Sequence, residues 1–125
     1  MRSSVAVLEA IDEGRDVIFD IDWQGAQIIA DQAPEDAVRI FILPPSLALL
    51  EDRLRKRGQD SDEVIRDRMN RAKDEISHWD EYDYVIVNDD FARALEKLNQ
   101  ALHAERLKRS RHPWLGGFVD ALMKQ

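Results

Sequence analysis

Two carboxylates, Asp20 and Asp22, end an apolar run that starts at Val17, and Gly25 follows them closely. Such a run is typical of a buried parallel strand, and open α/β folds bind their ligands at the carboxyl ends of such strands. Alternation along the strand would place both carboxylates on one face, where they could orient a magnesium-bound water or accept hydrogen bonds from a nucleotide base. The spacing fits a structural role equally well, with Asp22 as a helix N-cap and Asp20 as a solvated turn residue.

A cationic segment lies further along the chain and holds eight of its 18 lysines and arginines: Arg53, Arg55, Lys56, Arg57, Arg66, Arg68, Arg71 and Lys73. Arg53 and Arg57 are four residues apart and share a helical face, whereas Arg68 lies next to an apolar stripe. Guanidinium groups match the geometry of phosphates and neutralise the charge that builds up in phosphoryl transfer. Acidic residues alternate with these cations, so a solvated pair of helices joined by ion pairs is the structural alternative.

Asn88 directly follows a predicted strand, where its amide could contact a nucleobase edge or a ribose. An asparagine in this position also starts turns and caps helices. His78 and Trp79 lie near Tyr82 and Tyr84 and could stack on a base, but core packing at a helix-to-strand corner is the simpler interpretation.

The composition limits the classes of function. A length of 125 residues fits one domain with its own core. A net charge of -7 argues against non-specific nucleic-acid binding, and the absence of cysteine excludes disulfides, thiolate catalysis and Cys-ligated zinc. No apolar run approaches the roughly 20 residues of a membrane span. We therefore expect a cytoplasmic protein with no membrane segment.

Apolar periodicity and turn residues predict strands that alternate with helices. Strands are expected at Val17–Ile21, Val38–Leu43 and Tyr84–Val87. A helix is expected at Ser4–Ile11 and another at Trp23–Ala30. This alternation favours an α/β fold with a parallel sheet and right-handed crossovers.

Three further helices are expected in the second half of the chain. Ser46 should cap the first and Gly58 should close it. An acidic capping box, Asp60 to Glu63, should start the second. The last should begin after Asn88-Asp89-Asp90, which places caps and negative charge at its start. Its buried face should be Phe91, Leu95, Leu98 and Leu102. From Ser110 onward we expect a loop and a short amphipathic end.

Taken together, these segments resemble guanylate kinase over roughly residues 5 to 107. The matching stretches are Phe19 to Ala26, Ile40 to Ser46, Leu50 to Leu54, Arg57-Gly58, Arg68, Glu75, and Tyr82 to Asp90. Their order and spacing carry the resemblance. It implies a P-loop-kinase-type parallel sheet with flanking helices and a helical arginine lid at about residues 46–79. Residues 1–109 would form a partial guanylate kinase domain, and residues 110–125 a tail of unknown role.

The resemblance also implies a reaction and a set of site residues. The family transfers the terminal phosphate of ATP to GMP with Mg²⁺, which would be bound with ATP and have no direct protein ligand. Asp20 would lie near the GMP base and the water shell of the metal, and Asp22 would support it. Arg57 and Arg68 would be the catalytic lid arginines, and Asn88 would contact the adenosine of ATP.

The chain also departs from the family pattern. No Gly-x-x-x-x-Gly-Lys-Ser/Thr motif occurs in it, so the cradle for the ATP phosphates is missing, as is the GMP-binding segment. The sheet should therefore lack the strand that leads to the phosphate loop, which lies between Val17–Ile21 and Val38–Leu43 in this family. We expect an N-terminally truncated form with little or no turnover alone, marginal stability, and self-association through unpaired strands.

Two other functions stay open. Guanylate-kinase-like modules of scaffold proteins bind proteins without catalysis, and the chain could also lack any activity of its own. The presence of Asp20, Arg57, Arg68 and Asn88 favours descent from the enzyme over a binding module.

Overall fold

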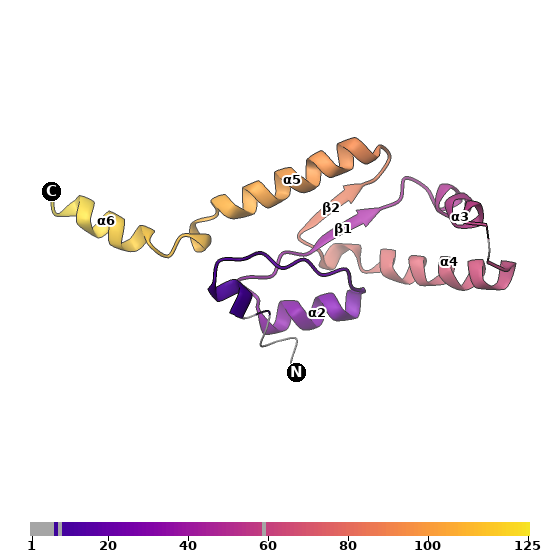
Figure 1. Cartoon of the computed structure of the whole chain (residues 1–125), viewed down its shortest axis with the longest axis horizontal. Coiled ribbons are helices and arrows are strands. Elements are labelled where there is room, and N and C mark those ends of the chain that lie inside the picture. Colours follow the sequence, from indigo (N-terminus) through magenta and orange to yellow (C-terminus); the bar gives the residue numbers. More distant parts are fainter. Residues whose placement is uncertain (1–6, 8, 59) are drawn as a thin grey trace.

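The computed structural model describes residue 7, residues 9–58 and residues 60–125. A two-stranded sheet lies near the centre, with α5 on one side and α2 and α4 on the other (Figure 1). The elements, in chain order, are α2 (Trp23–Gln32), β1 (Ile40–Leu43), α3 (Leu47–Lys56), α4 (Asp62–Ser77), the 3-10 helix η1 (Trp79–Glu81), β2 (Tyr84–Val87), α5 (Phe91–Leu107), the 3-10 helix η2 (Arg109–Arg111) and α6 (Leu115–Met123).

The sheet confirms the predicted α/β class with parallel strands. β1 and β2 pair in parallel, from Ile40 opposite Tyr84 to Leu43 opposite Val87. β2 has the predicted bounds, but β1 begins two residues later than expected. The reason lies at Arg39, whose backbone N–H donates to the Asp83 carboxylate at 2.8 Å instead of joining a regular ladder.

The predicted strand Val17–Ile21 is wrong in the described structure. Residues 15–21 have no regular secondary structure, and β1 pairs with β2 alone. A strand needs a neighbour to accept and donate its ladder hydrogen bonds, and no described residue supplies one. The apolar side chains of the segment are consequently exposed, to 94% for Ile18 and 42% for Phe19.

Predicted caps begin three of the helices. The Asp22 carboxylate accepts from the Gly25 N–H at 2.8 Å, and the Ser46 hydroxyl accepts from the Leu49 N–H at 3.0 Å. Asp90 accepts from two N–H groups in the first turn of α5. These contacts satisfy donors that a helix N-terminus otherwise leaves without an acceptor.

The start of α4 corrects the predicted capping box. Ser61, and not Asp60, is the N-cap, and its hydroxyl accepts from the Val64 N–H at 3.3 Å. Asp60 is unsuited to the role because its carboxylate binds the Arg68 guanidinium at 2.8 Å. Gly58 closes the preceding helix as predicted, with a φ of 84° that favours glycine.

The buried face of α5 also differs from the prediction. Ala94, Ala101 and Glu105 are buried, whereas Phe91 is 76% exposed and Leu95 is 48% exposed. These three buried residues form one narrow stripe at helical spacing. Since α5 packs against β2 in a sheet of only two strands, the described residues leave most of the predicted face exposed, and of its four members only Leu98 is half-buried.

The two ends of the chain complete the fold. Of the predicted helix Ser4–Ile11, residues 4–6 and 8 lie outside the described residues, while residues 9–12 are helical. The predicted amphipathic end is the helix α6, which projects from the body of the molecule (Figure 1). None of the described helices is both long enough and apolar enough to cross a membrane.

The molecule exposes more surface than a compact protein of its size. Its accessible surface is 10005 Å². A compact folded monomer of this mass would expose about 6,900 Å². Among the described residues, the buried apolar side chains are Ala10, Phe41, Ile65, Ile86, Ala94 and Ala101. The apolar core is therefore small, and a large apolar area stays exposed.

Candidate functional site

The helices α3 and α4 form a hairpin between β1 and β2, which we call the arm. Some of its cations are engaged in ion pairs, as the structural alternative predicted. Arg55 binds Asp62 at 2.7 Å and Glu51 at 3.3 Å. The Asp62 contact is the main reason why the pKa of Arg55 is raised, and Arg55 in turn lowers the pKa of Asp62.

The two predicted catalytic arginines both lie on the arm. Arg57 ends α3 and is exposed, and no ion pair joins it to any described residue. Arg68 lies in the middle of α4, where its guanidinium contacts Asp60 and its side chain is 44% exposed. Two residues along a helix correspond to a rotation of about 200°. Arg68 therefore points away from the side of α4 that carries Arg66.

A groove of about 440 Å³ lies between α3 and α4, on the side of Arg66. Its lining residues are Leu47, Ala48, Glu51, Arg55, Asp62, Arg66, Met69, Asn70 and Lys73. Arg57 and Arg68 are not among them. The structure thus separates the cationic segment into residues that line this groove and residues that do not.

The two predicted acids have different surroundings. Asp20 is exposed and makes no hydrogen bond or ion pair within the described part of the chain. Asp22 caps α2, as the structural interpretation of its position predicted. Within the described residues, no group of three or more His, Cys, Asp or Glu side chains could hold a metal ion.

Asn88 lies at the carboxyl edge of the sheet. Its backbone N–H donates to the Leu43 carbonyl at 2.8 Å, which extends the pairing of β1 and β2 by one bond. The side chain is half-buried. Because the arm starts just after Leu43, the structure brings Asn88 next to the point where the arm leaves the sheet. No described contact joins Asn88 to Asp20, Arg57 or Arg68.

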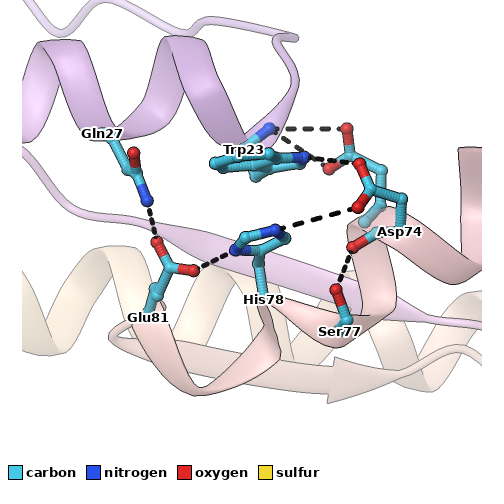
Figure 2. Close-up of polar contacts among 7 residues, drawn as sticks. Trp23, Gln27, Asp74, Ser77, His78 and Glu81 are labelled. Carbon is cyan, nitrogen blue, oxygen red and sulfur yellow. Dashed lines mark hydrogen bonds and ion pairs between the residues drawn. The ribbon is translucent and has the colours of Figure 1, made fainter.

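The start of α2 contacts the end of α4 through Trp23 (Figure 2). The Trp23 backbone N–H donates to the two Glu75 oxygens at 3.2 and 3.4 Å, and its indole N–H donates to Asp74 at 2.9 Å. The indole also stacks on the His78 ring, with centroids 3.6 Å apart and planes inclined by 13°. We call Trp23, Asp74, Glu75 and His78 the junction.

Partial burial changes the pKa of a carboxylate at the junction. Burial raises the pKa of Glu75, although the hydrogen bond from the Trp23 N–H opposes this shift. Beside the junction, Glu81 accepts a hydrogen bond from Gln27 and contacts His78, and these two contacts lower the pKa of Glu81. The carboxylates that contact the first turn of α2 are those of Asp22, Asp74 and Glu75.

Sequence reasoning did not find the junction. It placed His78 and Trp79 together at a corner, but Trp79 is 53% exposed, and the ring that stacks on His78 belongs to Trp23. The two rings are more than 50 residues apart, and no local pattern connects them. The only available signal was that Trp23 and Glu75 both belong to segments that resemble one family.

Comparisons with known proteins agree on one family. The guanylate kinase family model matches residues 2–105. The guanylate kinase of Maricaulis maris (strain MCS10) is 80% identical over 119 residues, which are 95% of this chain and 55% of that protein. The guanylate kinase of Caulobacter vibrioides is 52% identical over 119 residues, or 95% of this chain and 56% of that protein.

A solved structure supports the same assignment. The crystal structure of guanylate kinase from Anaplasma phagocytophilum matches with a TM-score of 0.76 at 33% identity and covers 92% of this chain and 54% of that one. The chain spans about half the length of the curated relatives it matches. Since the family model covers most of the chain, this protein belongs to the guanylate kinase family.

Proposed function

We propose that this chain provides the arginine lid and the strand-end contacts of a guanylate kinase, which transfers the terminal phosphate of MgATP to GMP and yields ADP and GDP. The observation that carries the proposal is the 80% identity to a guanylate kinase over 95% of the chain. Phosphoryl transfer depends on positioning and charge neutralisation more than on covalent chemistry, and an arm that carries arginines suits that task.

The arm is the proposed lid, at about residues 46–79, with Arg57 and Arg68 as the catalytic residues. Exposure and the absence of an ion pair within the described residues leave Arg57 available to a phosphate. Arg68 is held by Asp60 in a partly exposed pair. Pairs of this kind contribute about 0–1 kcal/mol, so a phosphate can replace the carboxylate at little cost.

Asp20, Asp22 and Asn88 have the remaining proposed roles. Asp20 would lie near the GMP base and the water shell of the magnesium ion, and its exposed carboxylate supports that role. Asp22 would support Asp20 by holding the first turn of α2. Asn88 would contact the adenosine of ATP from the carboxyl edge of the sheet. The metal would arrive with ATP, and we assign it no direct protein ligand.

The proposed domain is residues 1–109, with residues 110–125 as a tail of unknown role, in a cytoplasmic protein. Within it, a phosphate-loop strand would lie between Val17–Ile21 and β1. The exposed apolar side chains of Val17–Ile21 support an unfilled position there. Because the 125 residues contain no phosphate-loop motif, we propose that this polypeptide alone has little or no turnover and associates with itself through these edges.

The test is GMP-dependent release of ADP from MgATP. The 125-residue chain is assayed alone and mixed with the part of the Maricaulis maris guanylate kinase that it does not cover. We expect little turnover alone and restored turnover in the mixture. Arg57→Ala and Arg68→Ala should each lower the turnover of the mixture by about 10²-fold or more, since each removes a charge that stabilises the transition state.

The matched control is Arg66→Ala, which removes an arginine of α4 on the side away from Arg68 and should leave turnover unchanged. Fast turnover by the chain alone would refute the low activity proposed for it. A mixture that forms a complex and yet neither binds GMP nor releases ADP would refute the kinase proposal and favour the non-catalytic binding module.

A further inference from the structure

We propose that Trp23 and Glu75 are positioning residues, because the junction fixes the end of α4 to the start of α2 and thereby sets where Arg68 is held. The importance of Arg68 rests on the proposed function. The mechanical role of the junction does not, since it follows from contacts within the chain.

The hydrogen bonds of the junction satisfy groups that would otherwise lack partners. The first N–H groups of a helix have no acceptor within the helix. In α2, Asp22 accepts from Gly25, but the Trp23 N–H is left to a residue 52 positions away, Glu75. A carboxylate at this end of a helix also interacts favourably with the helix dipole. Glu75 thus completes the N-terminus of α2 from another element.

The indole of Trp23 makes two further contacts with the same end of α4. Its N–H donates to Asp74, and its face stacks on His78 (Figure 2). Asp74, Glu75 and His78 all belong to the last turn of α4 or its C-cap. One residue of α2 therefore contacts α4 by its backbone, its ring nitrogen and its ring face, which restricts both sliding and tilting of α4.

The junction lies at one end of α4, so a small tilt there displaces the residues further along the helix. Outside the arm, the contacts of α4 are concentrated at this same end, with η1 and with Trp23. Arg68 is seven residues from Glu75, or about 10 Å along the helix axis. A tilt of about 10° at the junction would therefore move Arg68 by about 2 Å, and misplacement by 1 Å costs a reaction roughly 10²-fold in rate.

The first experiment measures the position of the arm without any need for turnover. The chain has no cysteine, so spin labels can be attached at Glu63→Cys on α4 and Lys97→Cys on α5, both exposed positions. Pulsed dipolar spectroscopy then gives the distribution of distances between the labels. We expect Glu75→Ala to broaden or shift this distribution by about 3 Å, because Glu63 lies about 18 Å along α4 from Glu75.

Controls separate this effect from general loss of structure. Asp67→Ala removes an exposed carboxylate of α4 that makes no described contact, and it should leave the distribution unchanged. If Glu75→Ala does not fold, Trp23→Phe and Glu75→Gln decide the question. Trp23→Phe keeps an aromatic ring and removes the donor to Asp74, and Glu75→Gln keeps an acceptor and removes the charge. A wild-type distribution in both folded variants would overturn the proposal.

The second experiment tests the link to Arg68 in the mixture with the Maricaulis maris part. Glu75→Gln should lower kcat while KM for GMP stays within about twofold, because a misplaced arginine weakens the transition state more than ground-state binding. A broadened distribution with wild-type kcat would overturn the positioning role. A broadened distribution in a mixture that forms a complex and yet neither binds GMP nor releases ADP would refute the kinase proposal and leave the junction as a mechanical anchor.

Discussion

Replacement of Glu105 by alanine should strongly destabilise this protein. Glu105 is 5% exposed, although it lies on a helix with few buried residues. Its carboxylate accepts from the Tyr84 hydroxyl at 2.7 Å and pairs with Lys108 at 2.9 Å and with Arg111 at 3.4 Å. It therefore connects α5 to β2 and to η2, and alanine would remove all three contacts at once.

The size of the effect follows from the burial of the carboxylate. Removing one partner of a buried charge pair costs about 3–5 kcal/mol. Lys108 is 56% exposed and can regain water, so we expect the lower end of this range. With a denaturant slope of about 2 kcal/mol per molar urea, a loss of about 3 kcal/mol lowers the unfolding midpoint by about 1.5 M. Circular dichroism during urea titration measures it.

The dependence on pH gives a second check. Burial pushes the pKa of Glu105 up, but its hydrogen bonds with Lys108, Tyr84 and Arg111 outweigh burial and hold the pKa below the usual 4.5. A lowered pKa in the folded state contributes stability above pH 4.5, and this contribution is lost as pH falls through the lowered value. The difference in stability between wild type and Glu105→Gln should therefore shrink in acid.

The matched control is Glu96→Ala, which removes an exposed carboxylate from the same helix and should change stability by less than about 0.5 kcal/mol. If Glu105→Ala unfolded at the same urea concentration as Glu96→Ala, the three contacts would contribute nothing measurable, and the reasoning from burial would be wrong.

Three other outcomes are expected. Asp22→Ala should cost about 1 kcal/mol of stability in urea titration, because it removes the N-cap of α2, whereas Asp20→Ala should cost almost nothing; equal losses would contradict the distinction. Gly58→Ala should lower the free energy of unfolding by about 1–2 kcal/mol, because Gly58 has a φ of 84°. Gly116→Ala lies in a helix with open space at the added Cβ and should be neutral or stabilising, and calorimetry compares the two variants. Sedimentation should show association that rises with protein concentration. The accessible surface exceeds that of a compact monomer by about 3,100 Å², and a standard interface covers about 800 Å² per partner. A single monomeric species at all concentrations would contradict this.

The sequence predicted best those features that local chemistry decides. Ser46 and Asp90 cap their helices because a side-chain oxygen at that position reaches the next turn whatever surrounds it. Gly58 ends α3 because the positive φ penalises any side chain. The bounds of β2 were predicted correctly because the strand is short, apolar and flanked by turn residues.

Features that depend on a distant partner were predicted poorly. Val17–Ile21 has the composition of a strand, but pairing requires a neighbour, and none of the described residues provides it. The leucine face of α5 has the right periodicity, yet burial depends on what the helix packs against. For the same reason, the sequence did not single out Glu105 as a buried acid or Trp23 as the partner of His78.

The position of the arm between β1 and β2 has an evolutionary consequence. Two parallel strands cannot be joined by a tight turn, and their connection must return along the whole length of the sheet, about 13 Å for strands of four residues. Here the arm itself is that connection, as Figure 1 shows. A lineage can lengthen or shorten these helices, but deleting them would disconnect the two strands. The parallel sheet therefore requires a crossover at this place in the chain, and the cationic hairpin meets that requirement.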